Sequence, residues 1–381
     1  MPNRFERHPV RTAFLLAGFA LIAFLAFDVG AYYAGEGIAA FRENLALRRG
    51  TALPRPPGAQ RGDLEFHHGL KENWTSHNGS GATAYDEITN SLGFRDERVR
   101  DVPLKAPGRR IILIGDSFTE GVGLPFADTF AGMLLRRLAA AHTEVLNASA
   151  TSYSPIIYFR KLKFLLEEKG LVADEVVVFL DLSDIQDETF YKWGPEGQVQ
   201  SATSREWVRY ALTTHGEPYW LNWALQRTYV SRTLFGMLQR LSLPRDLPNR
   251  KALNFPRALW TLDPRDRDGF VKKGLPLALA HLDSLKALLD SRAVPMKLVI
   301  YPWPDQVWRH DLPSKQESIW ALWAAAHRVP LLDLFPDFIE RGPAREVLAR
   351  CFLPEDIHFS QAGHRLVADR VLATFWPATP P

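Results

Sequence analysis

The feature that most constrains the fold is residues 111–123, which read Ile-Ile-Leu-Ile-Gly-Asp-Ser-Phe-Thr-Glu-Gly-Val-Gly. The four apolar residues predict a short buried strand, and a helical pattern follows at about 126–140. This succession is typical of a parallel α/β sheet. Gly115 permits a tight turn, so Ser117 should lie just beyond the carboxyl end of the strand, where such sheets bind ligands. Ser117 is therefore a candidate nucleophile, and it requires a base.

The rest of the chain alternates in the same way. Further strand-like runs occur at 144–148, 175–180, 297–301 and 331–334. Helical patterns accompany them at 126–140, 155–169, 276–291, 314–327 and 363–375. Strands alternating with helices predict βαβ units and a parallel sheet. We therefore expect an α/β domain with a five-stranded parallel sheet in a three-layer α/β/α, flavodoxin-like arrangement.

A long interruption at about 190–273 separates the third and fourth strands. It is polar and aromatic, and it has helical patterns at about 204–214 and 219–241. A structureless loop of that length is improbable, so we interpret it as a helical insertion near the mouth of the site. Its tryptophans fit a small core better than sugar-stacking platforms; these are Trp193, Trp207, Trp220, Trp223 and Trp260.

Residues 1–35 are predicted to be a membrane anchor or signal segment. Three arginines precede an apolar stretch at 12–27, which Asp28 interrupts. A spanning helix needs about 20 apolar residues, and the apolar region of a signal peptide has about 7–15. We favour an uncleaved anchor over a cleaved signal, and a buried helix of the domain is the third interpretation. The positive flank places the N-terminus in the cytoplasm and the domain in a periplasm-like, extracytoplasmic compartment.

The anchor is followed by a predicted juxtamembrane linker at 36–62, which includes the stiff run Pro-Arg-Pro-Pro-Gly at 54–58. The domain itself is predicted at 63–378, and its first part, 63–108, should pack against the domain edge.

Composition excludes several classes of site. The 381 residues are 46% hydrophobic and 23% charged, which is a globular composition. The formal net charge of +3 is small and the basic residues are scattered, so no nucleic-acid partner is expected. The single cysteine, Cys351, excludes an internal disulfide and a zinc site built on several thiolates. His67, His68 and His77 lack an accompanying carboxylate frame, so we expect neither a metal nor a cofactor.

The base is predicted near the C-terminus. Residues 354–364 read Pro-Glu-Asp-Ile-His-Phe-Ser-Gln-Ala-Gly-His, and an amphipathic helical pattern follows. Asp356 would fix the imidazole tautomer of His358, and His358 would take the proton of Ser117. We expect His364 to cap or pack the last helix rather than to compete with His358 as the base.

These residues give the chain a resemblance to the SGNH, or GDSL, hydrolase family over roughly residues 90–375. The Gly-Asp-Ser block at 115–117 continues in a family-like way through 118–121, and residues 90–96 resemble the lead-in of bacterial envelope members. The resemblance implies the three-layer fold. It also implies that Ser117 is the nucleophile with its backbone N–H in the oxyanion hole, that His358 is the base and that Asp356 is the acid.

The chain departs from the family pattern at the acid. The family usually places two residues between acid and histidine, a spacing that Glu355 satisfies and Asp356 does not. We prefer Asp356, because Asp-Ile-His-Phe before a glycine-led helix resembles a variant of this block, and Glu355 stays as the alternative.

The oxyanion positions depart as well. By the resemblance, Ser152 aligns with the oxyanion glycine, whose backbone N–H survives the change. Ser183 stands where the oxyanion asparagine belongs, and its shorter side chain puts that contact in doubt. Asp116 is expected to orient the nucleophile turn. Asp184 and Asp187 are interpreted as a helix cap and solvated surface, although Asp184 could support a reshaped site.

The expected function is a serine esterase or O-acyltransferase that forms an acyl-enzyme on Ser117. The resemblance to envelope members implies an acylated carbohydrate of the cell envelope, or a small ester, as substrate. It also implies a membrane location through the N-terminal helix and polysaccharide-assembly proteins as partners. The alternative is a catalytically silent carbohydrate-binding or scaffold protein of the envelope, which the altered oxyanion positions motivate.

Overall fold

The computed structural model describes residues 8–48, 59–78, 85–202, 228, 230, 234, 237, 253, 256–262 and 269–377. The chain divides into two compact units, one containing the N-terminal helix and the other, Glu43–Ala202 with Leu243–Pro381, containing the sheet. The helical patterns at 204–214 and 219–241 lie outside the described residues, apart from the four isolated positions in the second of them. The helical insertion therefore stays a prediction.

The predicted five-stranded parallel sheet is confirmed. Its strands are β5 (Arg109–Ile114), β6 (Thr143–Asn147), β7 (Glu175–Leu180), β10 (Met296–Ile300) and β11 (Leu331–Asp333). Neighbouring strands are parallel, and their order is β11-β10-β7-β5-β6. In chain order this is 2-1-3-4-5, the flavodoxin-like order, which reverses direction between β5 and β7. Every residue of β7 is buried, as expected for a central strand.

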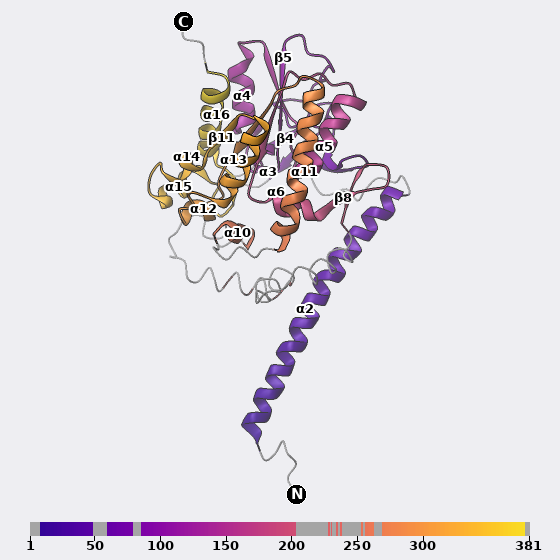
Figure 1. The fold of residues 1–381 in the computed structure, drawn as a ribbon, viewed down its shortest axis with the longest axis vertical. Coiled ribbons are helices and arrows are strands. Elements are labelled where there is room, and N and C mark those ends of the chain that lie inside the picture. Colours follow the sequence, from indigo (N-terminus) through magenta and orange to yellow (C-terminus); the bar gives the residue numbers. More distant parts are fainter. Residues whose placement is uncertain are drawn as a thin grey trace. The chain divides into compact units, whose positions relative to one another are not determined.

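Helices cover both faces of the sheet (Figure 1). The helix α4 (Phe130–Ala139) contacts α16 (Gln361–Phe375), and α5 (Pro155–Lys163) contacts α11 (Gly269–Ser291). Asp283 of α11 accepts a hydrogen bond from Trp323 of α13 (Lys315–His327). Right-handed crossovers place α4 on the face opposite α5, α11 and α13, because β5 to β6 runs against the direction of the other connections. The three-layer α/β/α architecture is thereby confirmed.

Three helical predictions differ in detail from the structure. The pattern at 126–140 is divided into a short 3₁₀ turn, η2 (Phe126–Asp128), and α4, because the extended Thr129 caps α4 through its side chain. The pattern at 155–169 ends as a π-helical segment, η3 (Phe164–Glu168). The helix predicted from 276 begins earlier, at Gly269, and Pro276 lies inside it.

Small elements surround the sheet. The hairpins pair β1 (Gln60–Asp63) with β2 (His67–Leu70), β3 (Thr75–Asn78) with β4 (Tyr85–Ile88), and β8 (Tyr191–Trp193) with β9 (Val199–Ser201). The short helices are α3 (Ser117–Glu120), α6 (Asp184–Asp187), η4 (Glu188–Phe190), η5 (Pro256–Ala258), α10 (Leu259–Leu262), α12 (Pro304–Trp308), α14 (Phe335–Ile339) and α15 (Ala344–Cys351).

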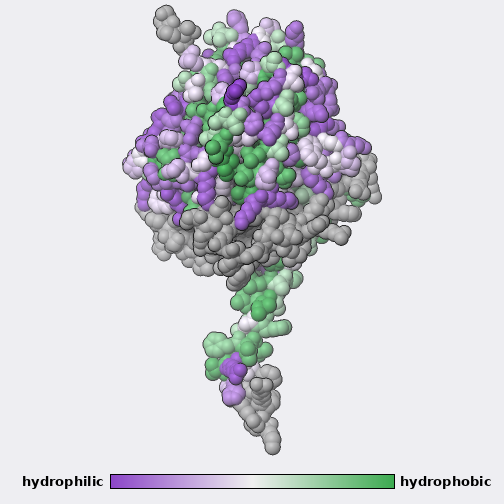
Figure 2. All heavy atoms as spheres, viewed as in Figure 1, coloured by the Kyte–Doolittle hydropathy of each residue, from purple (hydrophilic) through white to green (hydrophobic). Residues whose placement is uncertain are grey.

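The N-terminal helix α2 (Pro9–Arg48) contains a span, Pro9–Gly35, that is long and apolar enough to cross a membrane. Its side chains are largely exposed, and Figure 2 shows the visible part of the helix as mainly hydrophobic. A signal sequence near an N-terminus can also pass this test of length and composition, so the span fits both the anchor and the signal interpretation. Asp28 is buried and accepts a hydrogen bond from the backbone N–H of Val230 at 3.1 Å.

Candidate active site

The turn between β5 and α3 presents Ser117. Gly115 is required here, because a Cβ at this position would lie 2.3 Å from Thr119 Oγ1 and 3.0 Å from the carbonyl oxygen of Phe179. Asp116 caps α3 by accepting the backbone N–H of Phe118 at 3.0 Å. Ser117 therefore begins α3 at the carboxyl end of β5, beside the point where the strand order reverses, where flavodoxin-like sheets bind ligands.

His358 and Asp356 meet Ser117 from the other end of the chain. Nε2 of His358 lies 2.9 Å from Oγ of Ser117, and Nδ1 of His358 lies 2.6 Å from Oδ1 of Asp356. A carboxylate only accepts, so Nδ1 of the neutral imidazole carries the proton and Nε2 accepts the hydroxyl hydrogen of Ser117. The three predicted residues thus form a continuous Ser–His–Asp relay, and Asp356 rather than Glu355 holds the imidazole.

The loop before α16 holds this relay in shape. Asp356 Oδ1 also accepts the backbone N–H of His358 at 3.0 Å, and the carbonyl oxygen of His358 accepts the N–H of Leu353 at 2.8 Å. The ring of Phe118 packs beside the imidazole, with centroids 4.9 Å apart. The hydrogen bond with His358 holds the pKa of Asp356 below its usual value, so this carboxylate stays ionised.

Beneath Ser117 lies a cluster of buried carboxyl groups: Asp116, Asp181 and Asp184. Asp181 accepts from Trp303 Nε1 at 2.8 Å, and Asp184 accepts from the hydroxyl of Tyr158 at 2.5 Å and from the N–H of Asp181. Burial, then the charges of Asp181 and Asp184, raises the pKa of Asp116 well above its usual value. Asp116 thus buttresses the nucleophile turn as a hydrogen-bonded group beneath it.

The interpretation of Asp184 and Asp187 as a helix cap and solvated surface is wrong, because Ser183 is the N-cap of α6 and both carboxylates are buried. Their exposed fractions are 0% and 3%, because α6 is covered by η5 and α11. Asp187 pairs with Arg257, which also donates to Gln186 and to the carbonyl oxygen of Ser183. Burial raises the pKa of Asp187 to about 6, although Arg257 opposes the shift.

The loop that follows β6 carries Ser152. Its φ is +65°, a left-handed conformation that glycine adopts readily and other residues rarely do, as expected of a position that aligns with a family glycine. Three hydrogen bonds tie the end of β6 and this loop to α3. Asn147 Nδ2 donates to the carbonyl oxygen of Thr119 at 2.7 Å, and the backbone N–H and hydroxyl of Thr151 donate to Glu120 at 2.5 and 2.8 Å. The loop is therefore attached to the same short helix that carries Ser117.

Ser183 follows β7 at the predicted oxyanion position. Its hydroxyl donates to Asp181 Oδ1 at 2.8 Å, and its backbone N–H donates to the same oxygen at 2.6 Å. Since a hydroxyl has one hydrogen to donate, that hydrogen is committed to Asp181 in this structure. The side-chain donor that an asparagine supplies in the family has no counterpart at Ser183 here.

Neither a family model nor a curated protein matches the chain. The solved structures that match include GDSL-family lipolytic proteins and esterases. A putative lipolytic protein of the G-D-S-L family from Desulfitobacterium hafniense is 10% identical, with 70% of this chain and 100% of that chain covered and a TM-score of 0.39. A lipase/acylhydrolase from Enterococcus faecalis is 15% identical, with coverages of 71% and 100% and a TM-score of 0.35.

A psychrotrophic esterase, EstA, from a Pseudoalteromonas species is 12% identical, with coverages of 70% and 96% and a TM-score of 0.36. Likenesses this distant carry no argument about activity, so the chemistry rests on the geometry of this chain.

His364 is not a second base. Its ring is buried on α16 between Phe130 and Phe359, and its Nδ1 accepts the backbone N–H of Phe130 at 3.1 Å. Burial lowers the pKa of His364 to about 3, so the ring is neutral. The prediction that His364 packs the last helix is confirmed.

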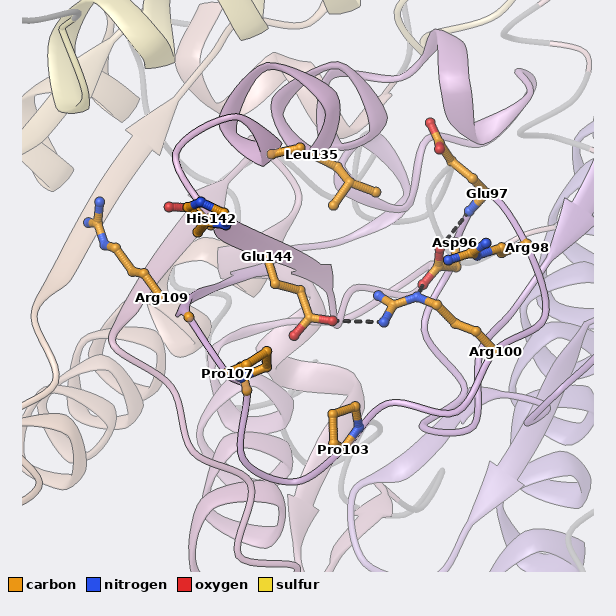
Figure 3. A pocket seen from close by; sticks show the side chains of 14 residues that line it. Asp96, Glu97, Arg98, Arg100, Pro103, Pro107, Arg109, Leu135, His142 and Glu144 are labelled. Atoms are coloured by element: carbon orange, nitrogen blue, oxygen red, sulfur yellow. Dashed lines mark hydrogen bonds and ion pairs between the residues drawn. The ribbon is translucent and has the colours of Figure 1, made fainter.

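A pocket of about 700 Å³ is lined by side chains that include Asp96, Arg100 and Glu144 (Figure 3). It lies at the opposite end of the sheet from Ser117. It opens where β5 and β6 begin, beside Arg109 and Thr143. Its floor is a chain of ion pairs in which Arg100 joins Asp96 to Glu144. Because the pocket lies at the start of β5 and Ser117 follows the end of that strand, these carboxylates are not part of the Ser117 site.

Sequence reasoning missed one group beside the site. His67 and His68 form a hydrogen-bonded pair, with their Nδ1 atoms 2.7 Å apart, and His68 Nε2 lies 2.7 Å from the carbonyl oxygen of Thr151. No sequence pattern links His68 to Thr151, because the two residues lie 83 positions apart. Among the described residues, no cluster of His, Cys, Asp or Glu suits a metal ion.

Proposed function

We propose that this chain is a serine esterase of the SGNH, or GDSL, superfamily that acts through an acyl-enzyme on Ser117. The observation that carries the proposal is the relay in which Ser117 Oγ, His358 and Asp356 are joined by contacts of 2.9 and 2.6 Å. Hydrogen-bonded nucleophile, base and orienting carboxylate together are the signature of acyl transfer.

The proposed reaction has two halves. Ser117 Oγ attacks the ester carbonyl carbon while its proton passes to His358 Nε2, and the ester C–O bond breaks as that proton moves to the leaving alkoxide. A water or a sugar hydroxyl then gives its proton to His358 Nε2 and attacks the carbonyl carbon of the acyl-serine. The bond between that carbon and Ser117 Oγ breaks as His358 returns the proton to Oγ, and the product is a free acid in the first case and a new ester in the second.

As substrate we propose an O-acylated carbohydrate of the cell envelope. Two features support it: the sequence resemblance to envelope members at 90–96, and the apolar span Pro9–Gly35, which would hold the domain at a membrane. The arginines that precede this span support an extracytoplasmic domain. The resemblance to envelope members supports polysaccharide-assembly proteins as partners. With the same serine, a sugar hydroxyl as acceptor would make the enzyme an O-acyltransferase.

One observation favours a second candidate function, a silent carbohydrate-binding protein. The hydroxyl of Ser183 is bonded to Asp181, so the site lacks the donor that the family's asparagine would supply. Loss of one oxyanion donor typically costs about 10²–10³-fold in kcat. The loss of this one donor would slow an enzyme without abolishing its activity. A silent protein would also require that the hydrogen-bonded set of Ser117, His358 and Asp356 be inactive.

The test is fluorophosphonate labelling of the full chain in detergent, followed by turnover of p-nitrophenyl acetate with and without an acetylated polysaccharide acceptor. We expect labelling at Ser117 in the wild type and in a control, Ser284→Ala, whose serine lies on the exposed side of α11. Ser117→Ala should fold, remain unlabelled and lack turnover. An unlabelled, cooperatively folded wild type would instead support the silent binding protein.

A further inference from the structure

The peptide between Thr151 and Ser152 is held from several sides. Its carbonyl oxygen, that of Thr151, lies 2.7 Å from Nε2 of His68. The backbone N–H and hydroxyl of Thr151 both donate to Glu120, at 2.5 and 2.8 Å. The carbonyl oxygen of Ser152 accepts the hydroxyl of Tyr191 at 2.7 Å. The peptide groups before and after Ser152 are both held by these hydrogen bonds, so the direction of the Ser152 N–H is fixed.

The direction follows from peptide geometry. In a trans peptide the C=O and the next N–H point in opposite directions across the plane. The carbonyl of Thr151 is aimed at His68, so the N–H of Ser152 is aimed away from that ring. The side chain of Ser152 is not needed for this, because the donor is in the backbone.

With both rings neutral, the hydrogen bonds of the two histidines have one consistent polarity. A carbonyl only accepts, so Nε2 of His68 donates to Thr151, and its Nδ1 is then an acceptor. Nδ1 of His67, 2.7 Å away, must then donate to it. Nε2 of His67 accepts in turn from Ser201 Oγ at 2.9 Å. The chain Ser201–His67–His68–Thr151 is therefore one directed array that ends on the peptide bearing the Ser152 N–H.

Two residues along this array have a strained backbone. His67, inside the array, has a φ of +79°, and Ser152, which follows its last member Thr151, has a φ of +65°, both in the left-handed region that side-chain-bearing residues rarely adopt. Strain of this kind persists where surrounding contacts over-determine the backbone, and such places cluster at functional sites. The rings of His68 and Tyr153 pack at 4.9 Å, and the hydroxyl of Tyr153 donates to the carbonyl oxygen of His68. The backbone that carries the two histidines is thus itself fixed.

We propose that His67 and His68 are positioning residues that hold the Ser152 N–H in place as an oxyanion donor, by clamping the carbonyl of Thr151. The inference rests on the proposed esterase function. With the hydroxyl of Ser183 committed elsewhere, the backbone donors carry more of the developing negative charge, and their alignment matters more. A clamp that acts only on a transition-state donor changes kcat and leaves KM alone.

The test compares His68→Phe, which keeps a ring without the donor, with His68→Gln, whose amide can still donate to the carbonyl. The control is His77→Phe on β3, a histidine whose side chain is 68% exposed and pairs with Asp86. Fluorophosphonate titration counts the competent Ser117 sites in each full-length preparation, so kcat is expressed per active site. We expect His68→Phe to lose roughly 10- to 100-fold in kcat with KM unchanged, less than the complete loss of a donor. His68→Gln should restore kcat by at least about half of the logarithm of that decrease, because its amide can still donate to the carbonyl. The kcat of the control His77→Phe should equal that of the wild type.

The tautomers give a second readout that does not depend on activity. With ¹⁵N-labelled histidine at neutral pH, His67 should carry its proton on Nδ1 and His68 on Nε2. A wild-type kcat per site in His68→Phe, or the opposite tautomers, would overturn the clamp while leaving the esterase proposal intact. A wild type that neither labels nor turns over would overturn the proposed function, and the positioning role with it.

Discussion

At the scale of single residues, the contacts of His358 distinguish two adjacent carboxylates. Nδ1 of His358 lies 2.6 Å from Asp356, whereas Glu355 stands one position earlier with a φ of +60°. We expect Asp356→Asn to lower kcat by up to about 10⁴-fold, since an amide that donates to Nδ1 would select the wrong tautomer. Glu355→Gln should stay within about threefold of the wild type. Measurement of kcat per labelled site for both variants shows which carboxylate orients His358. A larger loss of kcat in Glu355→Gln than in Asp356→Asn would assign this role to Glu355.

The strained backbone at Ser152 leads to a second prediction. Because the donor is the N–H, Ser152→Gly and Ser152→Ala should both keep kcat within about threefold. Glycine relieves the left-handed strain and raises the entropy of the unfolded chain, so the free energy of unfolding should change by less than about 1 kcal/mol. Steady-state kinetics with urea unfolding tests both parts. A more than tenfold loss in Ser152→Ala would show that the hydroxyl is the donor.

Ser117, Asp356 and His358 were predictable from the sequence, because each lies in a short run whose neighbours indicate its local structure. The hydrogen bond from His68 to Thr151 joins positions 83 residues apart, and only the folded chain brings them together. The burial of Asp184 was unpredictable for the same reason, since its cover comes from helices much later in the sequence. A short motif predicts the residues in its own run, whereas the hydrogen bond of His68 and the burial of Asp184 depend on contacts between distant parts of the chain.

At the scale of elements, strands were easier to predict than connections. All five strands of the sheet were placed within two residues, because parallel strands buried on both faces are continuous apolar runs. Short polar hairpins such as β3–β4 lack such a run. The start of the helix predicted at 276–291 was placed seven residues too late, because α11 begins at Gly269 and packs against α5 with Pro276 in its interior.

His364 of α16, which accepts a hydrogen bond from Phe130 of α4, leads to a prediction about stability in acid. His364 is buried as a neutral acceptor, with a pKa lowered to about 3 from an ordinary value near 6.5. The unfolded chain therefore binds a proton between these values and the folded chain does not. The stability due to this residue is complete above pH 6.5 and is lost as the pH falls toward 3, by on the order of 5 kcal/mol.

Chemical unfolding of the wild type and His364→Asn at pH 4 and pH 7 tests this. The variant keeps a side-chain acceptor and cannot titrate, so the stability difference between the two proteins should shrink or reverse at pH 4. His77→Asn, which alters an exposed histidine, should keep the slope of the wild type. Parallel pH dependences in the wild type and His364→Asn would contradict the assignment.

At the scale of the whole molecule, the length of the apolar span sets what the N-terminus can do. Pro9–Gly35 has 27 residues, which at 1.5 Å per residue gives about 40 Å, more than the roughly 30 Å of a bilayer core. A span beginning near Val10 reaches the far boundary of the hydrocarbon close to Asp28. The aspartate that interrupts the apolar run therefore falls where a polar group is tolerated.

We accordingly expect an integral, uncleaved anchor. The full chain should stay with membranes through an alkaline carbonate wash, leave them in detergent and keep its N-terminal residues by mass spectrometry. Phe19→Arg with Ile22→Arg places two charges near the middle of the span, at roughly 2.5–3.5 kcal/mol each, and should release the chain from the membrane pellet. Lys286→Arg, on the surface of α11, serves as the matched control because it changes no apolar position. A mature protein that begins after the apolar run would instead identify a cleaved signal. It would also separate the catalytic chemistry of Ser117 from the membrane, because a triad held wholly within the sheet unit works without an anchor.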